Sequence, residues 1–473
     1  MTISATPDAG PATGSGSVAT GLADYMVRTR DSELGQEVEH AAVRAVADWF
    51  AAVYAGGRMP APQVLADALL DETDTGPSRL VAAGRRVPCR VAALLNGTAA
   101  HTAELDDIYR WGLYHPGAPT IAAALAVGEQ VRCSGEQFLR GVAAGYEAGC
   151  RVAAAVNPDH YRYWHTTGTV GAIGAAAAAG EILALPAAGL AHALATATTL
   201  AAGLQQAFRS EAMSKPLHSG HAAESGVLAA LSARAGFTGA LDVLEGEAGF
   251  GAAMSVAPDW AAALSSLGQP PAITQVTVKN HSCCGHTFAA VDAALELRAR
   301  GVDPGAIRAI RVETYSVATS VAGNPDPSTD FEAKFSTQYC VAVALLTGAV
   351  RLRAFDEPVL TDPAVRSLMR RVTLVAAADL DSAFPGQRAA RVMVELATGE
   401  RIEAHRNTRK GDPDDPLTDD ELRAKFTNLV AEEVGDAASR ELLDALWQLP
   451  ALGDIRDLPL IAAGRDALHE SGA

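Results

Sequence analysis

The chain has 473 residues, enough for two or three domains with a large buried core. Hydrophobic residues make up 49% of it and aromatic residues only 5%, a composition that suits closely packed helices with small side chains. The formal net charge of −17 argues against a nucleic-acid partner, because phosphate binding needs clustered Lys and Arg. An anionic substrate would need positive charges that are gathered locally.

Residues 1–20 are rich in Gly, Ser, Pro and Thr and lack the basic and apolar stretches of a signal peptide. We therefore expect a disordered tail and a cytoplasmic protein. The Ala-rich runs 118–131 and 171–185 are interrupted before they reach the ~20 apolar residues that cross a membrane, so we expect buried helices and no membrane partner. The six cysteines follow no secreted-protein spacing, and we expect them to be reduced.

Residues 21–269 have a helical pattern, with apolar residues at three- and four-residue spacing between Gly and Pro breaks. The clearest segments are 38–55, 135–156 and 189–208. Much of this region is apolar on more than one face, which indicates helices inside a large bundle.

The pattern changes near Pro270. Three segments are rich in β-branched residues and predict strands: 273–280, 307–318 and 371–378. Apolar and charged side chains alternate over 310–314, as in a half-exposed strand, and 390–406 predicts a hairpin that turns at Thr398 and Gly399. Helical segments lie between these strands, so we expect a smaller α+β domain over 270–410.

Residues 411–473 return to a helical pattern. Thr418 and Glu421 form the sequence signature of a capping box, which predicts a helix beginning there. We expect these helices to rejoin the first domain. The predicted fold is mainly α with a smaller α+β domain: a large all-helical domain (21–269 and 411–473) interrupted by an α+β lid.

Five polar clusters stand out from the apolar background. The first, 101–119, contains acids and imidazoles that could transfer protons: His101, Glu104, Asp106, Asp107, Tyr109 and His115. The alternative is a solvated loop with acids at helix ends.

In the second cluster, His165 precedes Thr166 and Thr167, either of which could cap the next helix. The positive end of that helix could also bind an anion. A buried structural histidine is the alternative interpretation.

In the third cluster Lys215 precedes Pro216, which predicts extended backbone just before a helix. Its ammonium could point into a cleft or into solvent, and His218 and His221 are near enough in sequence to join it.

The fourth cluster is the octapeptide KNHSCCGH, residues 279–286. His281, Cys283 and His286 could supply three metal ligands, but no fourth follows, and adjacent cysteines suit neither one tetrahedral ion nor a redox C-x-x-C pair. We expect no metal here; Lys279 and the histidines could act instead as acid, base or carboxylate-binding groups.

The fifth cluster, 332–340, offers Lys334, Ser336, Gln338 and Tyr339. A tyrosine in such a position is usually structural.

Together these stretches resemble the MmgE/PrpD family, which includes 2-methylcitrate dehydratase, cis-aconitate decarboxylase and iminodisuccinate epimerase. The resemblance runs from about residue 24 to 450. It rests on eight motifs in order: LLNGTAAHTAELDD, HPGAP, GYEAGCRV, HTTGTVGAIGAAAAAG, KPLHSGHAAESG, KNHSCCGH, AKFSTQY and DPLTDDELRAKF.

The resemblance implies a helical domain and an α+β lid, a homodimer, and an active site in the cleft between the two domains, without metal or organic cofactor. Carried over by motif, the catalytic residues are Glu104, His115, His165, Lys215, His286 and Tyr339. Asp107, His218, Lys279 and His281 are expected to bind substrate.

Three departures from the decarboxylase branch matter. Glu104 stands where relatives have Asp, and Ile108 where the decarboxylase has Thr, which removes a hydroxyl. The octapeptide spacing is one residue short, so His286 is the better match for the third pocket histidine and His281 is its rival.

Dehydration, decarboxylation and epimerisation share one requirement, an enolate-like carbanion beside a carboxylate, stabilised by cations and donors placed in advance. We therefore expect a lyase or isomerase that acts on a small di- or tricarboxylate. Two alternatives remain: an isomerase or cyclase of a specialised pathway with a less charged substrate, and a non-catalytic binding protein.

Overall fold

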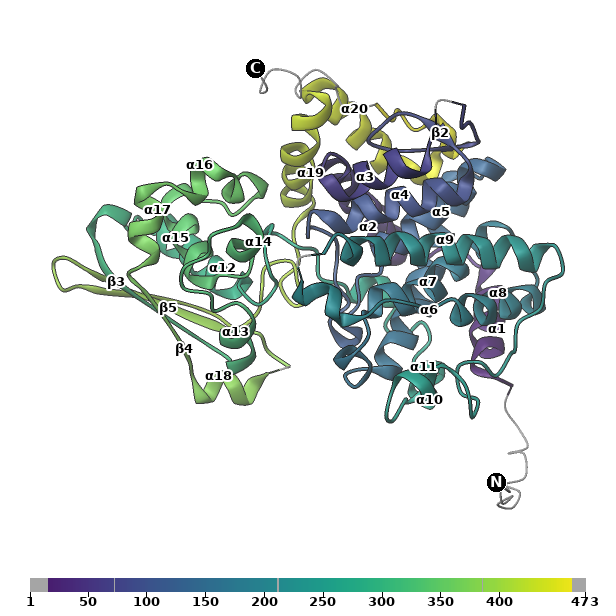
Figure 1. The fold of residues 1–473 in the computed structure, drawn as a ribbon, viewed down its shortest axis with the longest axis horizontal. Helices are drawn as coiled ribbons and strands as arrows, with labels where there is room; N and C mark the ends of the chain where they lie inside the picture. The colour runs from purple at the N-terminus through teal and green to yellow at the C-terminus, as the bar shows by residue number, and fades with distance from the viewer. Residues whose placement is uncertain (1–15, 72, 211, 385, 462–473) are drawn as a thin grey trace, which may run out of the picture.

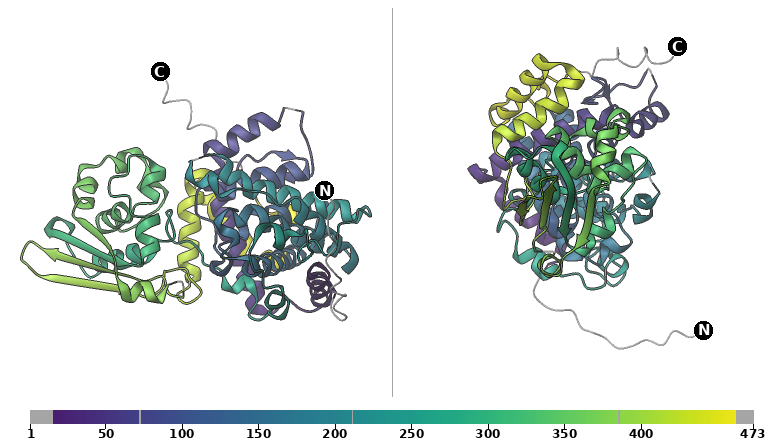
Figure 2. Two further views of the ribbon diagram at one scale, coloured as in Figure 1. Left: turned by 60° about the horizontal axis from the view of Figure 1, so that its bottom comes forward. Right: turned by 90° about the vertical axis from the view of Figure 1, so that its left-hand side faces the viewer.

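The computed structural model describes residues 16–71, 73–210, 212–384 and 386–461. They form a larger helical part and a smaller α+β part that lie side by side (Figures 1 and 2). The predicted fold class, mainly α with a smaller α+β part, is confirmed. Most of the predicted tail, residues 1–15, lies outside the described residues. Residues 18–20 are helical instead, because the Ser17 hydroxyl accepts a hydrogen bond from the Thr20 amide and caps the first helix.

Two stretches of chain build the helical part. Its α-helices and strands are α1 (Val18–Arg30), α2 (Gln36–Gly57), α3 (Pro60–Leu69), β1 (Ser78–Arg79), β2 (Arg86–Val87), α4 (Cys89–Thr102), α5 (Gly117–Val131), α6 (Gly135–Val156), α7 (Thr166–Ile182), α8 (Ala187–Thr199), α9 (Ser214–Arg234), α10 (Phe250–Met254), α11 (Trp260–Ser265), α19 (Asp419–Val434) and α20 (Asp436–Trp447).

The α+β part lies between α11 and α19. Its elements are α12 (Phe288–Ala299), β3 (Ile307–Thr314), α13 (Ser316–Val321), α14 (Asp330–Lys334), α15 (Thr337–Thr347), α16 (Glu357–Leu360), α17 (Pro363–Met369), β4 (Val372–Ala376), α18 (Ala378–Ala383), β5 (Ala390–Leu396) and β6 (Arg401–Arg406).

Short 3-10 helices connect the elements of both parts. They are η1 (Arg110–Gly112), η2 (His160–Arg162), η3 (Gln205–Arg209), η4 (Ala272–Gln275), η5 (Pro304–Ala306), η6 (Leu352–Phe355), η7 (Leu449–Ala451) and η8 (Ile455–Asp457).

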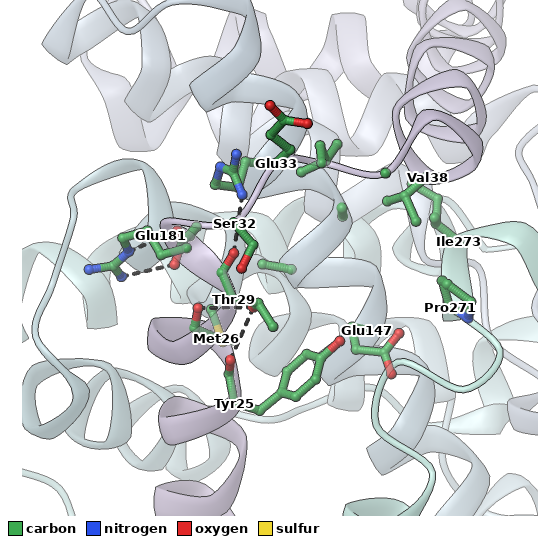
Figure 3. Close-up of a pocket in the computed structure, with 16 residues that line it drawn as sticks. Tyr25, Met26, Thr29, Ser32, Glu33, Val38, Glu147, Glu181, Pro271 and Ile273 are labelled. Atoms are coloured by element: carbon green, nitrogen blue, oxygen red, sulfur yellow. Dashed lines mark hydrogen bonds and ion pairs between the residues drawn. The ribbon is translucent and has the colours of Figure 1, made fainter.

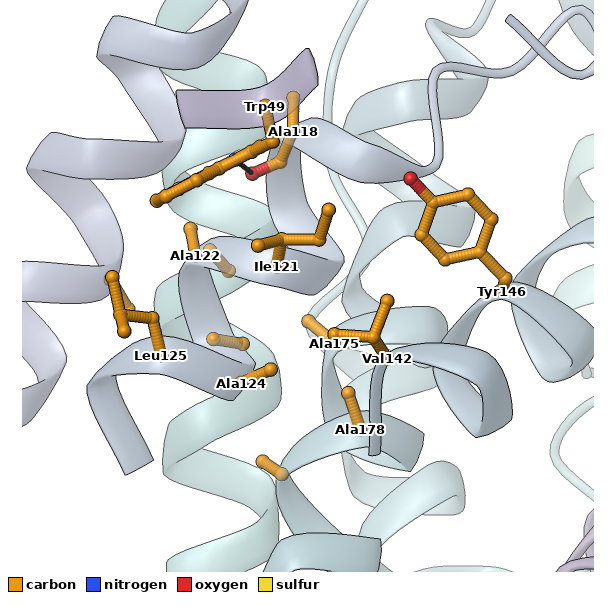
Figure 4. Close-up of a cluster of buried hydrophobic side chains, with 14 of the residues drawn as sticks. Trp49, Ala118, Ile121, Ala122, Ala124, Leu125, Val142, Tyr146, Ala175 and Ala178 are labelled. Atoms are coloured by element: carbon orange, nitrogen blue, oxygen red, sulfur yellow. Dashed lines mark hydrogen bonds between the residues drawn. The ribbon is translucent and has the colours of Figure 1, made fainter. Parts of the chain in front are cut away.

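Helix α7 lies at the centre of the helical part, and every residue of it is buried. Its Ala- and Gly-rich sequence lets neighbouring backbones come close: a Cβ on Gly174 would lie 3.0 Å from the Gly145 carbonyl oxygen of α6. Larger side chains, such as Trp49 and Ile121, fill the space around α5 and α2 (Figure 4). The low aromatic content thus corresponds to a core of closely packed helices.

The sheet of the α+β part has the order β4-β3-β5-β6, with β3 parallel to β4 and antiparallel to β5. Along β3, Ile310 and Val312 are buried and Arg311 is exposed, as the alternation predicted. The predicted hairpin at 390–406 is confirmed as β5 and β6, with Gly399 at a positive φ of 87° in the turn.

Two predicted elements are wrong in part. Residues 273–280 form no strand: η4 occupies 272–275, and Thr277 makes only an isolated bridge to Ile108. No neighbouring strand is available there to extend the pairing. The helix predicted at 189–208 ends at Thr199, and η3 follows it. The capping box at Thr418 is confirmed.

The junction of the two parts is built by polar contacts. Ile108 and Thr277 exchange both main-chain hydrogen bonds, at 2.9 and 2.7 Å. Arg409 donates to the carboxylate of Asp412 from Nε and Nη2, and the same Nη2 lies 3.3 Å from the Thr277 hydroxyl. Lys425 of α19 donates to the carbonyl of Leu105 at 3.1 Å. The loop after α4 is therefore held by Thr277, in the segment before the α+β part, and by Lys425 of α19, which follows that part.

All six cysteines lie in the described part of the chain and are free thiols. Among the helices of the described residues, none is long and apolar enough to cross a bilayer.

Candidate active site

Glu104 follows α4 and accepts ion pairs from two lysines. Lys215 Nζ contacts its Oε1, and Lys279 Nζ lies 3.3 Å from its Oε2 and 3.0 Å from its main-chain oxygen. The Glu104 backbone has a φ of 58°, in the left-handed region that side-chain-bearing residues rarely adopt. Surrounding contacts must hold such a conformation, and strain of this kind concentrates at functional sites.

The two lysines reach Glu104 from different segments. Lys215 lies in the first turn of α9, so the predicted extended backbone is wrong: the helix begins one residue earlier, at Ser214. Its ammonium lies 4.7 Å from the ring centroid of Phe208. Burial lowers the pKa of Lys215 to about 7, and the charge of Lys279 acts in the same direction. Contact with the Glu104 carboxylate opposes this shift and favours the ammonium.

A second group, here called the histidine cluster, comprises His101, Asp106, His115, His165 and His218. Asp106 Oδ2 lies 2.6 Å from His101 Nδ1 and 3.3 Å from His115 Nδ1. The His165 and His218 Nδ1 atoms are 3.0 Å apart, and the His101 and His165 rings stack with centroids 5.3 Å apart. Four imidazoles are thus arranged around one carboxylate.

The charges in the cluster follow from its burial. Burial acts to raise the pKa of Asp106, but His101 and His115 hold it well below its ordinary value. Burial lowers the pKa of His101 and of His218 to about 4, and it lowers that of His165 well below its ordinary value. At neutral pH these three imidazoles are therefore neutral, next to an ionised Asp106. The His101 nitrogen that faces Asp106 carries the ring proton, which leaves its other nitrogen as an acceptor.

Close helix packing brings these residues together. His101 lies in the last turn of α4, His165 is the N-cap residue of α7 without a capping side chain, and His218 lies one turn after Lys215 in α9. A Cβ on Gly168 would lie 2.9 Å from the Cβ of His218. The glycine therefore permits the approach of α7 and α9 that places the two histidines in contact.

The α+β part contributes a third side to the site. The Cys284 amide donates to the Lys334 carbonyl at 2.8 Å, and the Lys334 ammonium lies close enough to Lys215 to lower its pKa. His286 Nδ1 lies 2.7 Å from the hydroxyl of Tyr315, and burial lowers the pKa of His286 to about 3.

Three predicted site residues form hydrogen bonds or ion pairs only with residues of their own part of the fold. Tyr339 lies in the α+β core, and its hydroxyl donates to the Ala354 carbonyl at 2.5 Å. His281 is buried and lies 2.8 Å from the carboxylate of Asp292. Asp107 accepts from the Tyr146 hydroxyl and the Gly117 amide, and burial raises its pKa to about 7. The contacts of all three are structural.

The structure therefore brings Glu104, His115, His165, Lys215 and two predicted binding residues into one region. The two are His218 and Lys279. His286 contacts Tyr315 within the α+β part, and Tyr339, His281 and Asp107 do not take part in these contacts either. Two members, His101 and Asp106, were named among the possible proton-transfer groups of the first cluster but were not assigned as catalytic or binding residues. Their position in the polar 101–119 segment was the available signal, since its density of acids and imidazoles is unusual in this chain.

Two residue sets bear on metal binding. In the octapeptide, His281 is engaged by Asp292, Cys283 by Thr287 and His286 by Tyr315, so its three candidate ligands have separate partners. In the histidine cluster, one ligand atom each from His101, Asp106 and His115 lie within 4.8 Å of one another. Two imidazoles and a carboxylate are a ligand set that divalent transition metals accept.

A separate cavity of about 210 Å³ lies between α1, α6 and the loop before α2 (Figure 3). Two of its carboxylates are already engaged: Glu181 with Arg30, and Glu147 with Arg151 and the amides of Gly268 and Ala272. It offers little for proton-transfer chemistry, and the candidate site remains the junction near Glu104.

Fold and site together define a two-part, mainly helical protein of the enzyme class, with ammonium groups, a carboxylate and neutral imidazoles gathered where its parts meet. The chain belongs to the MmgE/PrpD family. Residues 20–263 match the MmgE/PrpD N-terminal domain and residues 281–449 the MmgE/PrpD C-terminal domain. The resemblance seen in the sequence motifs is confirmed.

Three relatives carry a related name. The chain is 28% identical to the cis-aconitate decarboxylase-like protein oryM of Aspergillus oryzae, over 95% of this chain and 98% of that protein. It is 28% identical to human cis-aconitate decarboxylase over 80% of each chain. It is 26% identical to the mouse enzyme, over 82% of this chain and 81% of that one. Family and relatives support an enzyme with a dehydratase- or decarboxylase-type function.

Proposed function

We propose that the protein is a cofactor-independent lyase that removes a group next to a carboxylate of a small di- or tricarboxylate. One observation carries the proposal: Lys215 and Lys279 converge on Glu104 immediately beside the histidine cluster. Ammonium groups suit the carboxylates of a substrate, and neutral imidazoles suit proton transfer near neutral pH. The decarboxylase relatives make elimination of carbon dioxide or water the favoured outcome.

In this proposal the lysines first bind a substrate carboxylate. Lys215 and Lys279 give up part of their contact with the Glu104 carboxylate and bind the substrate carboxylate instead. The negative charge of the substrate thereby takes the place of the Glu104 charge next to the two ammonium groups. Because both ammonium groups are largely withdrawn from water, their attraction for a developing enolate is stronger than at the surface.

Proton transfer then determines the product. The carboxylate of Asp106 lies 3.3 Å from His115 Nδ1, and the His115 side chain is 17% exposed and therefore accessible to a substrate. We assign the base to His115. In dehydration it takes the proton from carbon, and the imidazolium so formed passes that proton, directly or through His165 or His286, to the departing hydroxyl, which leaves as water. In decarboxylation the carbon–carbon bond breaks, carbon dioxide leaves, and the carbanion takes a proton that His115 has received from solvent.

Proton NMR of the purified protein in deuterated water tests the proposal. Citrate-like, aconitate-like and aspartate-derived acids are screened in parallel, and we expect one class to lose water or carbon dioxide with deuterium entering at carbon. The same screen with His115→Asn is the control for the assigned base. The lyase assignment is wrong if folded protein leaves every acid in the panel unchanged.

A second candidate is an isomerase or epimerase, including one acting on a less charged substrate. It is favoured by Ile108, which replaces a hydroxyl-bearing residue of the decarboxylase branch and lies near Gly285 at the junction. Deuterium exchange at a substrate carbon without loss of water or carbon dioxide would support this candidate.

We further propose that the protein works as a homodimer and needs no metal or organic cofactor, as the family resemblance implies. Light scattering after size-exclusion chromatography measures the first property. Activity after exhaustive chelation and dialysis measures the second.

A further inference from the structure

Arg388 precedes β5 in the α+β part and has an unusual environment. Its Nε is buried and has no hydrogen-bond partner, and no carboxylate of the described residues lies within ion-pair distance of its guanidinium. The guanidinium lies 5.8 Å from the ring centroid of Phe384. Buried guanidinium nitrogens normally have an anionic or carbonyl partner, so the unpaired Nε of Arg388 requires an explanation.

A neighbouring arginine shows the contrast. Arg409 donates two hydrogen bonds to the carboxylate of Asp412, at 2.6 and 3.0 Å, and a third at 3.3 Å to the carbonyl of Gly285. Its charge is compensated within the fold. The charge of Arg388, in the same region, is not compensated in this way and remains available to an anion that comes from outside.

Contacts around Arg388 lead to the candidate site. Phe384 stacks on Tyr315 with centroids 4.5 Å apart, and the Tyr315 hydroxyl lies 2.7 Å from His286 at the end of the octapeptide. Arg388 also lies close enough to Cys284, and to Tyr161 of the helical part, for its charge to act on them.

Cys284 links this region to the junction. Its amide is bonded to the Lys334 carbonyl, and a Cβ on the next residue, Gly285, would lie 3.7 Å from Ile108, beside the loop that carries Glu104. Arg388 therefore approaches the junction from the α+β side, and the two lysines approach it from the helical side and the connecting segment.

We propose that Arg388 forms a second anion subsite, which binds a substrate carboxylate distant from the one held by Lys215 and Lys279. A guanidinium binds carboxylate with two parallel hydrogen bonds and so fixes its orientation as well as its charge. The substrate class is accordingly a polycarboxylate whose acid groups span the junction. This inference rests on the proposed function only in placing the first carboxylate at the lysines.

Binding of two probes separates the subsites. Calorimetry measures tricarballylate, with three carboxylates, and NMR titration measures butyrate, with one. We expect Arg388→Gln to weaken tricarballylate binding by about tenfold to a hundredfold and to leave butyrate binding unchanged. Lys215→Met should weaken both probes. Arg370→Gln, which removes an exposed arginine from the same part of the fold, is the matched control and should change neither.

Two results would overturn the subsite: unchanged tricarballylate binding in Arg388→Gln, or equal weakening of both probes. Arg388→Lys keeps the charge but loses the paired hydrogen bonds, and it serves as the test if the glutamine variant does not fold. It should retain only part of the affinity for tricarballylate. Wild-type affinity for tricarballylate in this variant would contradict the inference. If the proposed function is wrong, the result is different: no acid is turned over, but Arg388→Gln still weakens tricarballylate binding and leaves butyrate binding unchanged.

Discussion

Replacement of Lys215 by methionine tests the electrostatic role of the lysine pair. Methionine keeps most of the volume next to Phe208 and removes the ammonium. Glu104 keeps Lys279 as a partner, at 3.3 Å from the carboxylate and 3.0 Å from the main-chain oxygen, so the substitution leaves no unpaired buried anion. We therefore expect the folded state to survive and the activity to fall.

The magnitude follows from Coulomb's law. Two unit charges about 4 Å apart attract by about 4 kcal/mol at an effective dielectric constant of about 20. Lys279 retains part of this attraction, and removal of a single oxyanion-binding donor in other enzymes lowers kcat by about 10²–10³. We expect kcat/KM to fall by about two to four decades, with about 1.36 kcal/mol per decade in the activation free energy.

The assay measures kcat/KM on the acid that the deuterated-water screen identifies, with thermal unfolding as a check on the fold. Lys410→Met is the matched control, because Lys410 also forms ion pairs, with Asp415 and Glu421, but lies partly exposed outside the site. Its activity should remain within about twofold of wild type. Activity within tenfold of wild type in a folded Lys215→Met protein would refute the role assigned to the ammonium.

Three further outcomes are expected. Because the pKa of Asp107 is raised to about 7, its contribution to stability is fully present below pH ~4 and is lost as the pH rises through 7. In urea unfolding, the free energy of unfolding of Asp107→Asn should therefore rise relative to that of wild type between pH 4 and 7. A difference that does not change with pH would contradict this. His281→Asn should lower the unfolding temperature, because His281 is bonded to Asp292. His286→Asn should lower turnover and have a smaller effect on the unfolding temperature. The reverse pattern would make His281 the active-site histidine of the α+β part. Activity should survive EDTA, whereas added Zn²⁺ should inhibit reversibly by binding the histidine cluster, and zinc-insensitive turnover would argue against that geometry.

Local pattern allowed much of the fold to be predicted. The alternation of Ile310 and Val312 with charged residues defined β3, and Thr418 with Glu421 marked the start of α19, because both signals act between residues close in sequence. Residues 273–280 show where such signals fail. Their β-branched residues favour extended backbone, but a strand also needs a partner along its length, and here only Thr277 finds one.

The candidate site was predictable in part for the same reason. Polar residues in an Ala-rich background, such as Glu104, His165 and Lys215, stand out in the sequence, and the family motifs give them an order. Arg388 has no such signal, because an arginine in a sequence otherwise looks like any surface charge. Only the missing carboxylate partner distinguishes it, and that is a property of the folded environment.

The sequence by itself determined the family, the mainly helical class with its α+β part, and most of the residues able to carry charge or protons at the junction. The tertiary structure decided their relations: that two lysines share Glu104, that Asp106 organises the histidine cluster, and that Tyr339 bonds within its own core. The physical reason is that ionisation and hydrogen bonding depend on burial and on distances of a few ångströms between residues far apart in the chain. Helix packing sets those distances, and no local pattern encodes them.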